Sequence, residues 1–505
     1  MRKLLLFLLV SIALPALAQN GKKVYADFHG VRYTRQHDGK LGRWEMYANT
    51  EKSSTGRKSL CYNADLIDSE GRHEIAAVAY PQVGMQSNLD PDYIDPMFHA
   101  KILGTKTGNL DTYFCDDDTV NYILNDSSKG CDIAVIEGVM GYYDGMGGIS
   151  DKASTYDVAR ATGTPVVLIV DCRGMSLSIV PIIKGLMDYK ENSFISGVIL
   201  NRTTYHMYAR LKGVIEESLG IKVFGYIPDV REFTIESRHL GLIMPHEIKN
   251  LKEKIDSMAK RLVETVDING IIKTAETAKD MPFSPPHIPK LDKKVRIGVA
   301  MDNVFCFYYN ENLTIMEKMG AEIVPFSPLM DKAMPDGLDG VIFGGGYPEL
   351  FSKELSENRH MLKSVKETLE GGTPVFAECG GFMYLSDMLE SARGINYNMA
   401  GFIKGHCYKT EQLNRFGYAE IRIERPSIFG SEKTVFKGHE FHYWDSTNNG
   451  DGAVAVKPMS EKSWNCAHAG ENMFAGFPHL YFYSNIKAVY NFLKKCGERN
   501  GNSVL

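Results

Sequence analysis

The sequence predicts an α/β protein with two domains, each built around a parallel-sheet core. From about residue 90, short apolar runs rich in β-branched residues alternate with segments of helical period, a pattern typical of parallel sheets. The same alternation starts again after a proline-rich stretch at 275–294, which is predicted to be an extended linker. With 505 residues and 44% hydrophobic content, the chain can form a core in each domain.

The first domain is expected over residues 90–274. Its strands are predicted at 132–137, 165–171, 197–201 and 223–227, with helices between them at 178–189 and 208–217. Ligands of such sheets bind at the carboxyl ends of the strands. Glu137 follows an apolar strand and is therefore a candidate Mg²⁺ ligand, with Asp144 in the glycine-rich loop beyond it. Acids that only shape turns are the alternative for both.

The second domain is expected over residues 295–500, and Cys379 is its candidate nucleophile. The apolar run 373–377 leads into Glu378-Cys379-Gly380-Gly381, and a helix-compatible segment follows. A cysteine at the start of a helix lies at the positive end of the dipole, which favours the thiolate. A buried apolar cysteine is the alternative.

Glycine-rich turns supply the groups that acyl transfer at a thiol needs. The N–H of Gly380 is a candidate oxyanion donor, and Gly345 and Gly346 end the preceding strand and offer further donors. His479, after a short apolar stretch, is the candidate base.

Two further histidines, His439 and His442, lie three residues apart. This spacing suits neither a helical metal pair nor an open zinc site without a third ligand, so a structural or substrate-facing role is favoured over metal binding.

Charge and cysteine usage restrict the class of protein. The net charge is −5 and no basic run occurs, so nucleic acid is not an expected partner. The 9 cysteines include no C-x-x-C pair and indicate a reducing compartment.

The N-terminus instead indicates export, in conflict with the reducing compartment that the cysteines indicate. Arg2 and Lys3 precede the apolar run 4–14 and an Ala16-Leu17-Ala18 cleavage pattern, so residues 1–18 read as a secretory signal peptide, too short to span a membrane. A buried first strand is the alternative. Residues 19–89 have a β-like texture without a catalytic motif. Their segment 54–59 does not meet the phosphate-loop pattern G-x-x-x-x-G-K-S/T.

Taken together, the ordered motifs from about residue 90 to 490 closely resemble the cobyrinic acid a,c-diamide synthase family. The resemblance rests on the segments 91–99, 109–111, 132–145, 197–201, 238–242, 305–309, 344–349, 377–385 and 438–443. It implies a dethiobiotin synthetase-like, P-loop-type ATPase domain followed by a class I glutamine amidotransferase domain. In such an enzyme Cys379 attacks glutamine, His479 transfers protons, and the ammonia amidates the a and c carboxylates of cobyrinate after activation by Mg²⁺ and ATP.

The resemblance also assigns residues of the first domain. Asp92, Tyr93, Glu137 and Asp144 match family positions linked to Mg-ATP and the substrate carboxylate, and Asn201 matches the position that contacts adenine. Family members carry a phosphate loop just before Pro91, and residues 1–90 do not supply one. A defective or chimeric member, retaining at most glutaminase activity or tetrapyrrole binding, is therefore the alternative. The chemistry implies the cytoplasm, in conflict with the signal-like N-terminus, and no membrane partner.

Overall fold

The computed structural model describes Tyr93 and residues 107–138, 140–230, 250–431 and 433–498, together with several short strands. The short strands are β1 (Lys23–Val24), β2 (Arg35–Gln36), β3 (Leu66–Asp68), β4 (Gly71–His73), β5 (Ile75–Ala77), β10 (Ser237–Arg238) and β11 (Gly241–Leu242). The predicted signal peptide, the segment 54–59 that was compared with a phosphate loop, and Asp92 lie outside the described residues. Among the described helices, none has the length and apolar character needed to cross a membrane.

The first domain is organised around a parallel sheet of β7 (Val166–Asp171), β8 (Ile195–Asn201) and β9 (Lys222–Ile227). β6 (Ile133–Val135) pairs in parallel with β5. Alternate residues of β8 face opposite layers: Val198 packs with α5 (Ile179–Asp188) and α6 (Tyr205–Leu219), and Ile199 with α7 (Leu251–Thr265). The strand and helix positions agree with those predicted from sequence.

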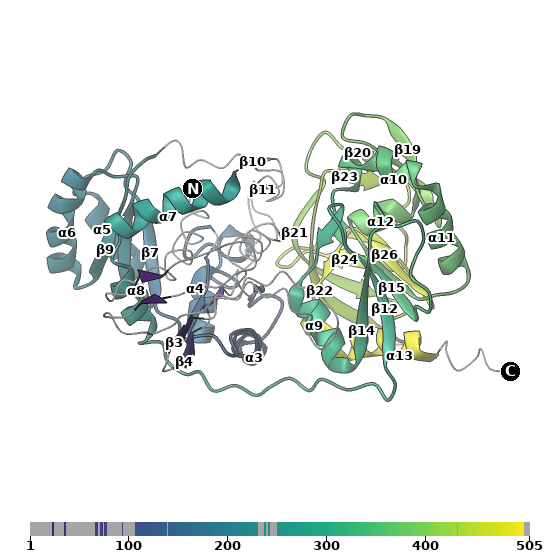
Figure 1. Cartoon of the computed structure of the whole chain (residues 1–505), viewed down its shortest axis with the longest axis horizontal. Coiled ribbons are helices and arrows are strands. Elements are labelled where there is room, and N and C mark those ends of the chain that lie inside the picture. The colour runs from purple at the N-terminus through teal and green to yellow at the C-terminus, as the bar shows by residue number, and fades with distance from the viewer. Residues whose placement is uncertain are drawn as a thin grey trace.

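The helices of the first domain start and end where the sequence provides caps. Asp116 caps α3 (Asp117–Ser127) and Ser154 caps α4 (Thr155–Thr162) by accepting a backbone N–H of the first turn. α4 and α6 end at glycines in the left-handed conformation, Gly163 and Gly220. α8 (Ile268–Ala275) follows α7, and residues 277–294 run on without helix or strand to the second domain (Figure 1).

The second domain contains a ten-stranded sheet. Its parallel half consists of β14 (Ala321–Phe326), β12 (Val295–Ala300), β15 (Gly340–Phe343), β17 (Val375–Glu378) and β26 (Met473–Gly476). An antiparallel half continues it through β25 (Ser463–Gly470), β24 (Ala453–Val456), β21 (Arg415–Ile423), β22 (Thr434–His442) and β27 (His479–Leu480). The sequence predicted the parallel half. The antiparallel half was not foreseen, because it arises from strands joined without intervening helices.

Smaller elements complete this domain. They are the helices α9 (Asn310–Met319), α10 (Ser352–Glu357), α11 (Arg359–Glu370), α12 (Gly380–Leu385) and α13 (Ile486–Glu498), the pair β13 (Phe305–Phe307) and β16 (Gly345–Gly346), and a sheet of β19 (Asn396–Asn398), β18 (Ser386–Glu390), β20 (Ile403–Lys409) and β23 (Trp444–Ser446). Short 3-10 turns in the described part of this domain are η3 (Pro348–Leu350) and η4 (Phe482–Asn485), and η1 (Met146–Gly148) belongs to the first domain.

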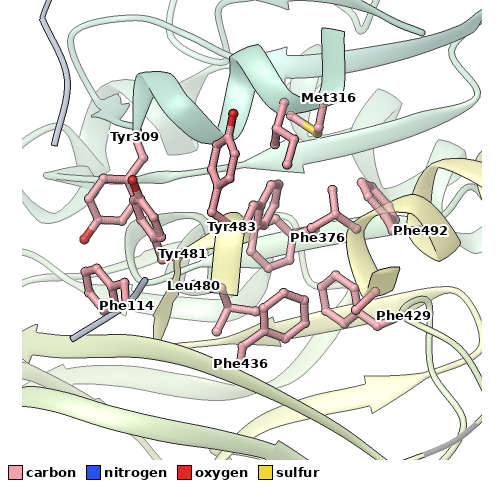
Figure 2. Close-up of a cluster of buried hydrophobic side chains, with 14 of the residues drawn as sticks. Phe114, Tyr309, Met316, Phe376, Phe429, Phe436, Leu480, Tyr481, Tyr483 and Phe492 are labelled. Atoms are coloured by element: carbon pink, nitrogen blue, oxygen red, sulfur yellow. The ribbon is translucent and has the colours of Figure 1, made fainter. Parts of the chain in front are cut away.

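An aromatic core joins the sheet to the C-terminal helix of the second domain. Phe429 lies 4.8 Å from Phe436 and 5.8 Å from Phe376 in edge-on geometry, and Phe492 of α13 closes the group (Figure 2). Edge-on pairs of buried rings stabilise a core beyond the area they bury. Phe114 of the first domain extends this core, since its ring stacks on Tyr481 at 4.9 Å. The two domains therefore share one continuous hydrophobic cluster.

Candidate active site

Cys379 lies on a sharp turn between β17 and α12. Its backbone has φ 46° and ψ −105°, a conformation that costs energy for a residue with a side chain. The turn is fixed by the Cys379 N–H, which donates to the Gly476 carbonyl at 2.8 Å. A Cβ on Gly381 would lie 2.2 Å from the Phe343 carbonyl oxygen, so only glycine fits there. Strain held in place by its surroundings is typical of functional sites.

The Cys379 thiol is buried, and its surroundings hold its pKa above the ordinary value. Only 7% of the residue is exposed, and burial raises the pKa of the thiol, as does the nearby Glu349 carboxyl; the Gly380 N–H opposes them. The sequence predicted that the helix dipole would favour the thiolate. In the structure α12 is a short helix of 6 residues, and the pKa of the thiol is shifted in the opposite direction, with burial as the largest cause.

The three glycines predicted as oxyanion donors pack closely against neighbouring residues of the site. Gly346 has φ 151°, and a Cβ there would lie 1.7 Å from the Val304 carbonyl oxygen. A Cβ on Gly380 would lie 3.1 Å from the Gly346 nitrogen, and one on Gly345 would lie 2.4 Å from His479 Cε1. The backbone of β16 thus lies directly beside both the cysteine turn and the histidine.

His479 opens β27 and pairs with His439 across the sheet. The two imidazole rings are stacked, with centroids 4.8 Å apart and planes 3° from parallel. Burial, together with the nearby His442, lowers the pKa of His479 to about 3. His479 is therefore a neutral imidazole, the form in which it can accept a proton.

Glu378 is a site residue that sequence reasoning missed. It precedes Cys379, is 5% exposed, accepts the Leu480 N–H at 2.7 Å and lies 4.0 Å from Nδ1 of His479. Burial raises its pKa to about 8, opposed by the Leu480 hydrogen bond. The available signal was an acidic residue at the end of an apolar strand. Glu349, in η3, is a second buried acid near the thiol, with a pKa raised to about 8 by burial.

The remaining histidines of β22 have well-defined partners. Nδ1 of His439 lies 3.0 Å from the Tyr309 hydroxyl, and Nε2 of His442 lies 2.9 Å from Glu440 Oε2. Both residues are buried. Across the described ranges, no cluster of three or more His, Cys, Asp or Glu side chains is arranged to hold a metal ion.

The candidate residues of the first domain differ in their burial. Glu137 is buried just beyond β6, and Asn201 is buried at the end of β8, in register with Asp171 of β7. Asp144 is exposed and accepts the Gly141 N–H at 3.0 Å, the geometry of a turn-forming acid.

Tyr93 lies against the second domain, a placement that the sequence did not indicate. Its ring stacks on Phe307 at 5.1 Å and lies 5.4 Å from the ring of His479. Only 6% of the residue is exposed. One predicted residue of the first domain is therefore in contact with the predicted base of the second.

A cavity of about 480 Å³ opens at the same edge of the sheet as Cys379. It is lined by Arg415, Thr447, Asn448, Asn449, Gly450, Asp451, Trp464, Asn465 and His468. Gly476 pairs with Glu378 of β17 and with Ala467 of β25, so Trp464 and Asn465 lie beyond the edge at which β17 ends. The lining is mainly polar, with the Arg415 guanidinium 5.6 Å from the Trp464 ring centre.

The site thus contains a buried cysteine on a strand-to-helix turn, with the glycine backbone of β16 next to that turn and to His479, an arrangement of the kind that thiol acyl transfer requires. In agreement, residues 296–486 match the family described as the CobB/CobQ-like glutamine amidotransferase domain.

Whole-chain relatives define the family more narrowly. Cobyrinate a,c-diamide synthase of Caldanaerobacter subterraneus subsp. tengcongensis is 37% identical over 411 residues, covering 81% of this chain and 90% of the relative. The enzyme of that name from Clostridium tetani is 38% identical over 411 residues (81% and 92%). That of Limosilactobacillus reuteri is 34% identical over 418 residues (81% and 91%). The chain belongs to the cobyrinate a,c-diamide synthase family.

Proposed function

We propose that this protein is a carbon–nitrogen ligase that takes nitrogen from glutamine and, with ATP, amidates the a and c side-chain carboxylates of cobyrinate in cobalamin biosynthesis. Membership of the family supports the overall reaction. The observation that carries the glutamine half is the Cys379 turn with His479 and the glycine backbone around it.

In this proposal Cys379 is the nucleophile. Its Sγ attacks the carboxamide carbon of glutamine while the neutral His479 imidazole takes the thiol proton. The N–H groups of Gly346 and Gly380 stabilise the oxyanion of the tetrahedral intermediate. The proton then passes from His479 to the leaving nitrogen, releasing ammonia and a thioester, and water hydrolyses the thioester to glutamate.

The activating half is assigned to the carboxyl edge of the first sheet. Glu137 is a buried carboxyl just beyond β6, a group that suits Mg²⁺ because this ion prefers oxygen ligands. Bound Mg²⁺ neutralises phosphate charge. Asn201 at the end of β8 is proposed to contact adenine, and Asp92, Tyr93 and Asp144 remain proposals for ATP and substrate handling. Because glutamine and ATP are cytoplasmic supplies, we propose the cytoplasm as the location.

A second candidate is a glutaminase that is not coupled to ATP. It is favoured by the sequence of residues 1–90, which contains no G-x-x-x-x-G-K-S/T pattern. Calorimetric titration with Mg-ATP separates the candidates: tight binding supports the ligase, and no binding together with glutamate release supports the uncoupled glutaminase.

The glutamine half is tested by Cys379→Ala. We expect glutamate release to fall by about 1,000-fold or more, because the covalent intermediate cannot form. Cys131→Ser is the matched control, since this cysteine is partly exposed in the first domain, and it should retain wild-type activity. Undiminished glutamate release by Cys379→Ala would remove this residue as the nucleophile.

A further inference from the structure

The segment Asn109-Leu110-Asp111, which precedes α3, has no role in the reaction as described so far. It belongs to the first domain by sequence, and its three residues are 3%, 0% and 2% exposed. Buried polar groups need hydrogen-bond partners, and both backbone groups of Asn109 and one carboxylate oxygen of Asp111 find theirs in the second domain.

The backbone of Asn109 is held from two sides. Its N–H donates to Glu311 Oε1 of α9 at 2.8 Å, and its carbonyl accepts the Tyr481 hydroxyl at 3.1 Å. A Cβ on Gly108 would lie 2.0 Å from Glu311 Oε1, so the chain approaches α9 as closely as glycine allows. These contacts join residues that are more than 200 positions apart in the sequence.

Asp111 combines a local and an inter-domain role. Its Oδ1 accepts the Tyr113 N–H at 2.7 Å and shapes the loop, and its Oδ2 accepts the Tyr418 hydroxyl of β21 at 2.6 Å. Nζ of Lys437 donates to the Tyr113 carbonyl at 2.7 Å, and the rings of Tyr113 and Tyr418 stack at 4.2 Å. Hydrogen bonds to a charged group in a buried site are stronger than neutral ones.

These contacts lie next to the stacked histidines, at the position where Tyr481 and Lys437 face each other through a backbone hydrogen bond of 3.1 Å. Tyr481 follows His479 by two residues, and Lys437 precedes His439 by two residues. Figure 2 shows Phe114 and Tyr481 side by side, with Tyr309 close to both. The Tyr309 hydroxyl in turn lies 3.0 Å from His439 Nδ1. The segment is thus connected by direct packing to the two strands that carry the histidines.

We propose that residues 109–114 form an inter-domain clasp, which holds the first domain on strands β22 and β27 and so positions His479 relative to the activating half. Asp111 and Tyr418 are its central pair. They are positioning residues that do not touch the reacting atoms. The consequence for catalysis rests on the proposed function: with the clasp closed, ammonia released at Cys379 reaches the activated carboxylate, and with it loosened, ammonia escapes to solvent.

The first experiment measures the clasp without any activity. Hydrogen–deuterium exchange of the full chain is compared between wild type, Asp111→Asn, Tyr418→Phe and the double variant. We expect each single variant to raise amide exchange by about tenfold or more at both 107–127 and 479–485, because Tyr418→Phe removes the buried hydrogen bond between the two side chains and Asp111→Asn replaces its carboxylate acceptor by an amide. In the double variant the increase in exchange should be close to that of either single variant and well below the sum of the two increases, because the two residues form one interaction.

Tyr408→Phe is the matched control, since this partly buried tyrosine lies on β20 and its hydroxyl makes no hydrogen bond in the described structure. It should leave exchange at both segments unchanged. If Asp111→Asn and Tyr418→Phe raised exchange only at 107–116, or at neither segment, the clasp would be disproved.

The second experiment measures coupling with Tyr418→Phe. Glutamate and amidated cobyrinate are quantified with glutamine, and again with ammonium chloride, as the nitrogen source. We expect the glutamate released per amide formed to rise severalfold, while the ammonium-dependent rate stays at the wild-type value. An equal fall in the amidation rate with both nitrogen sources, or an unchanged ratio of glutamate to amide, would overturn the role in coupling. If wild type amidates no cobyrinate, the proposed function fails, and the exchange experiment still decides on the clasp.

Discussion

Replacing Glu378 by Gln tests whether this buried acid assists His479. The amide oxygen of Gln can still accept the Leu480 N–H, which Glu378 binds at 2.7 Å, so we expect the free energy of unfolding to change by less than about 1 kcal/mol below pH 4.5, where the Glu378 carboxyl is neutral in the folded and the unfolded chain. Glu378→Ala instead leaves this N–H buried without a partner and should cost about 1–3 kcal/mol.

The catalytic effect follows from the separation of 4.0 Å between Glu378 Oε2 and His479 Nδ1. At an effective dielectric constant near 20, opposite charges at this distance attract by about 4 kcal/mol once His479 has taken the thiol proton. Because the pKa of Glu378 is raised to about 8, ionising it at pH 7 costs about 1.4 kcal/mol. The difference, about 2.7 kcal/mol, predicts that Glu378→Gln lowers kcat for glutamate release about 100-fold.

The same residue predicts a pH dependence of stability. A carboxyl whose pKa rises from 4.5 to about 8 on folding stabilises the protein fully below pH 4.5, and this contribution is lost as the pH rises through about 8. Urea unfolding of Glu378→Gln between pH 4.5 and 8 should therefore show a smaller loss of stability than wild type. Glu370→Gln, on the exposed side of α11, is the control. A variant with wild-type kcat and an unchanged pH dependence would refute the reasoning.

Two further predictions address the glycine backbone and the histidine pair. Gly346→Ala should lower the free energy of unfolding by more than about 3 kcal/mol and abolish glutamate release, because its Cβ would lie 1.7 Å from the Val304 carbonyl oxygen. Gly470→Ala is the control and should be tolerated, because its Cβ would have no atom within 4 Å. Equal urea midpoints for the two variants would contradict this prediction. Burial lowers the pKa of His479 from 6.5 to about 3, so its neutral form stabilises the fold above pH 6.5, and this contribution is lost as the pH falls. Between pH 7 and 5 the free energy of unfolding of wild type should therefore fall by about 2 kcal/mol more than that of His479→Asn. The same pH dependence of urea unfolding in both proteins would argue against a buried neutral imidazole.

Local features of the site could be predicted from adjacent residues. An apolar run, a cysteine and two glycines indicate a strand-to-helix turn, and β17, Cys379 and α12 form one. Gly345 and Gly346 were identified in the same way, since glycine pairs at strand ends allow close backbone approach. The division into domains at 275–294 and the catalytic roles stay predictions.

Other features depend on pairing between distant segments. His439 and His479 are 40 positions apart in the sequence, and they stack only because β22 and β27 pair in antiparallel register. Glu378 lies near His479 because β17 pairs with β26, where Glu378 is in register with Gly476, three residues before His479. Asp111 is brought to Tyr418 by packing across 307 positions. No local pattern encodes such contacts, because they depend on which strands become neighbours.

By itself, therefore, the sequence determined the α/β class, the turn that presents Cys379 and the family to which the chain belongs. Only the tertiary structure decided the protonation states around the thiol and the clasp between the domains. The physical reason is that a turn is fixed by the dihedral preferences of a few neighbouring residues, whereas the pKa of Cys379, Glu378 or His479 is set by burial beneath chain segments far away in sequence.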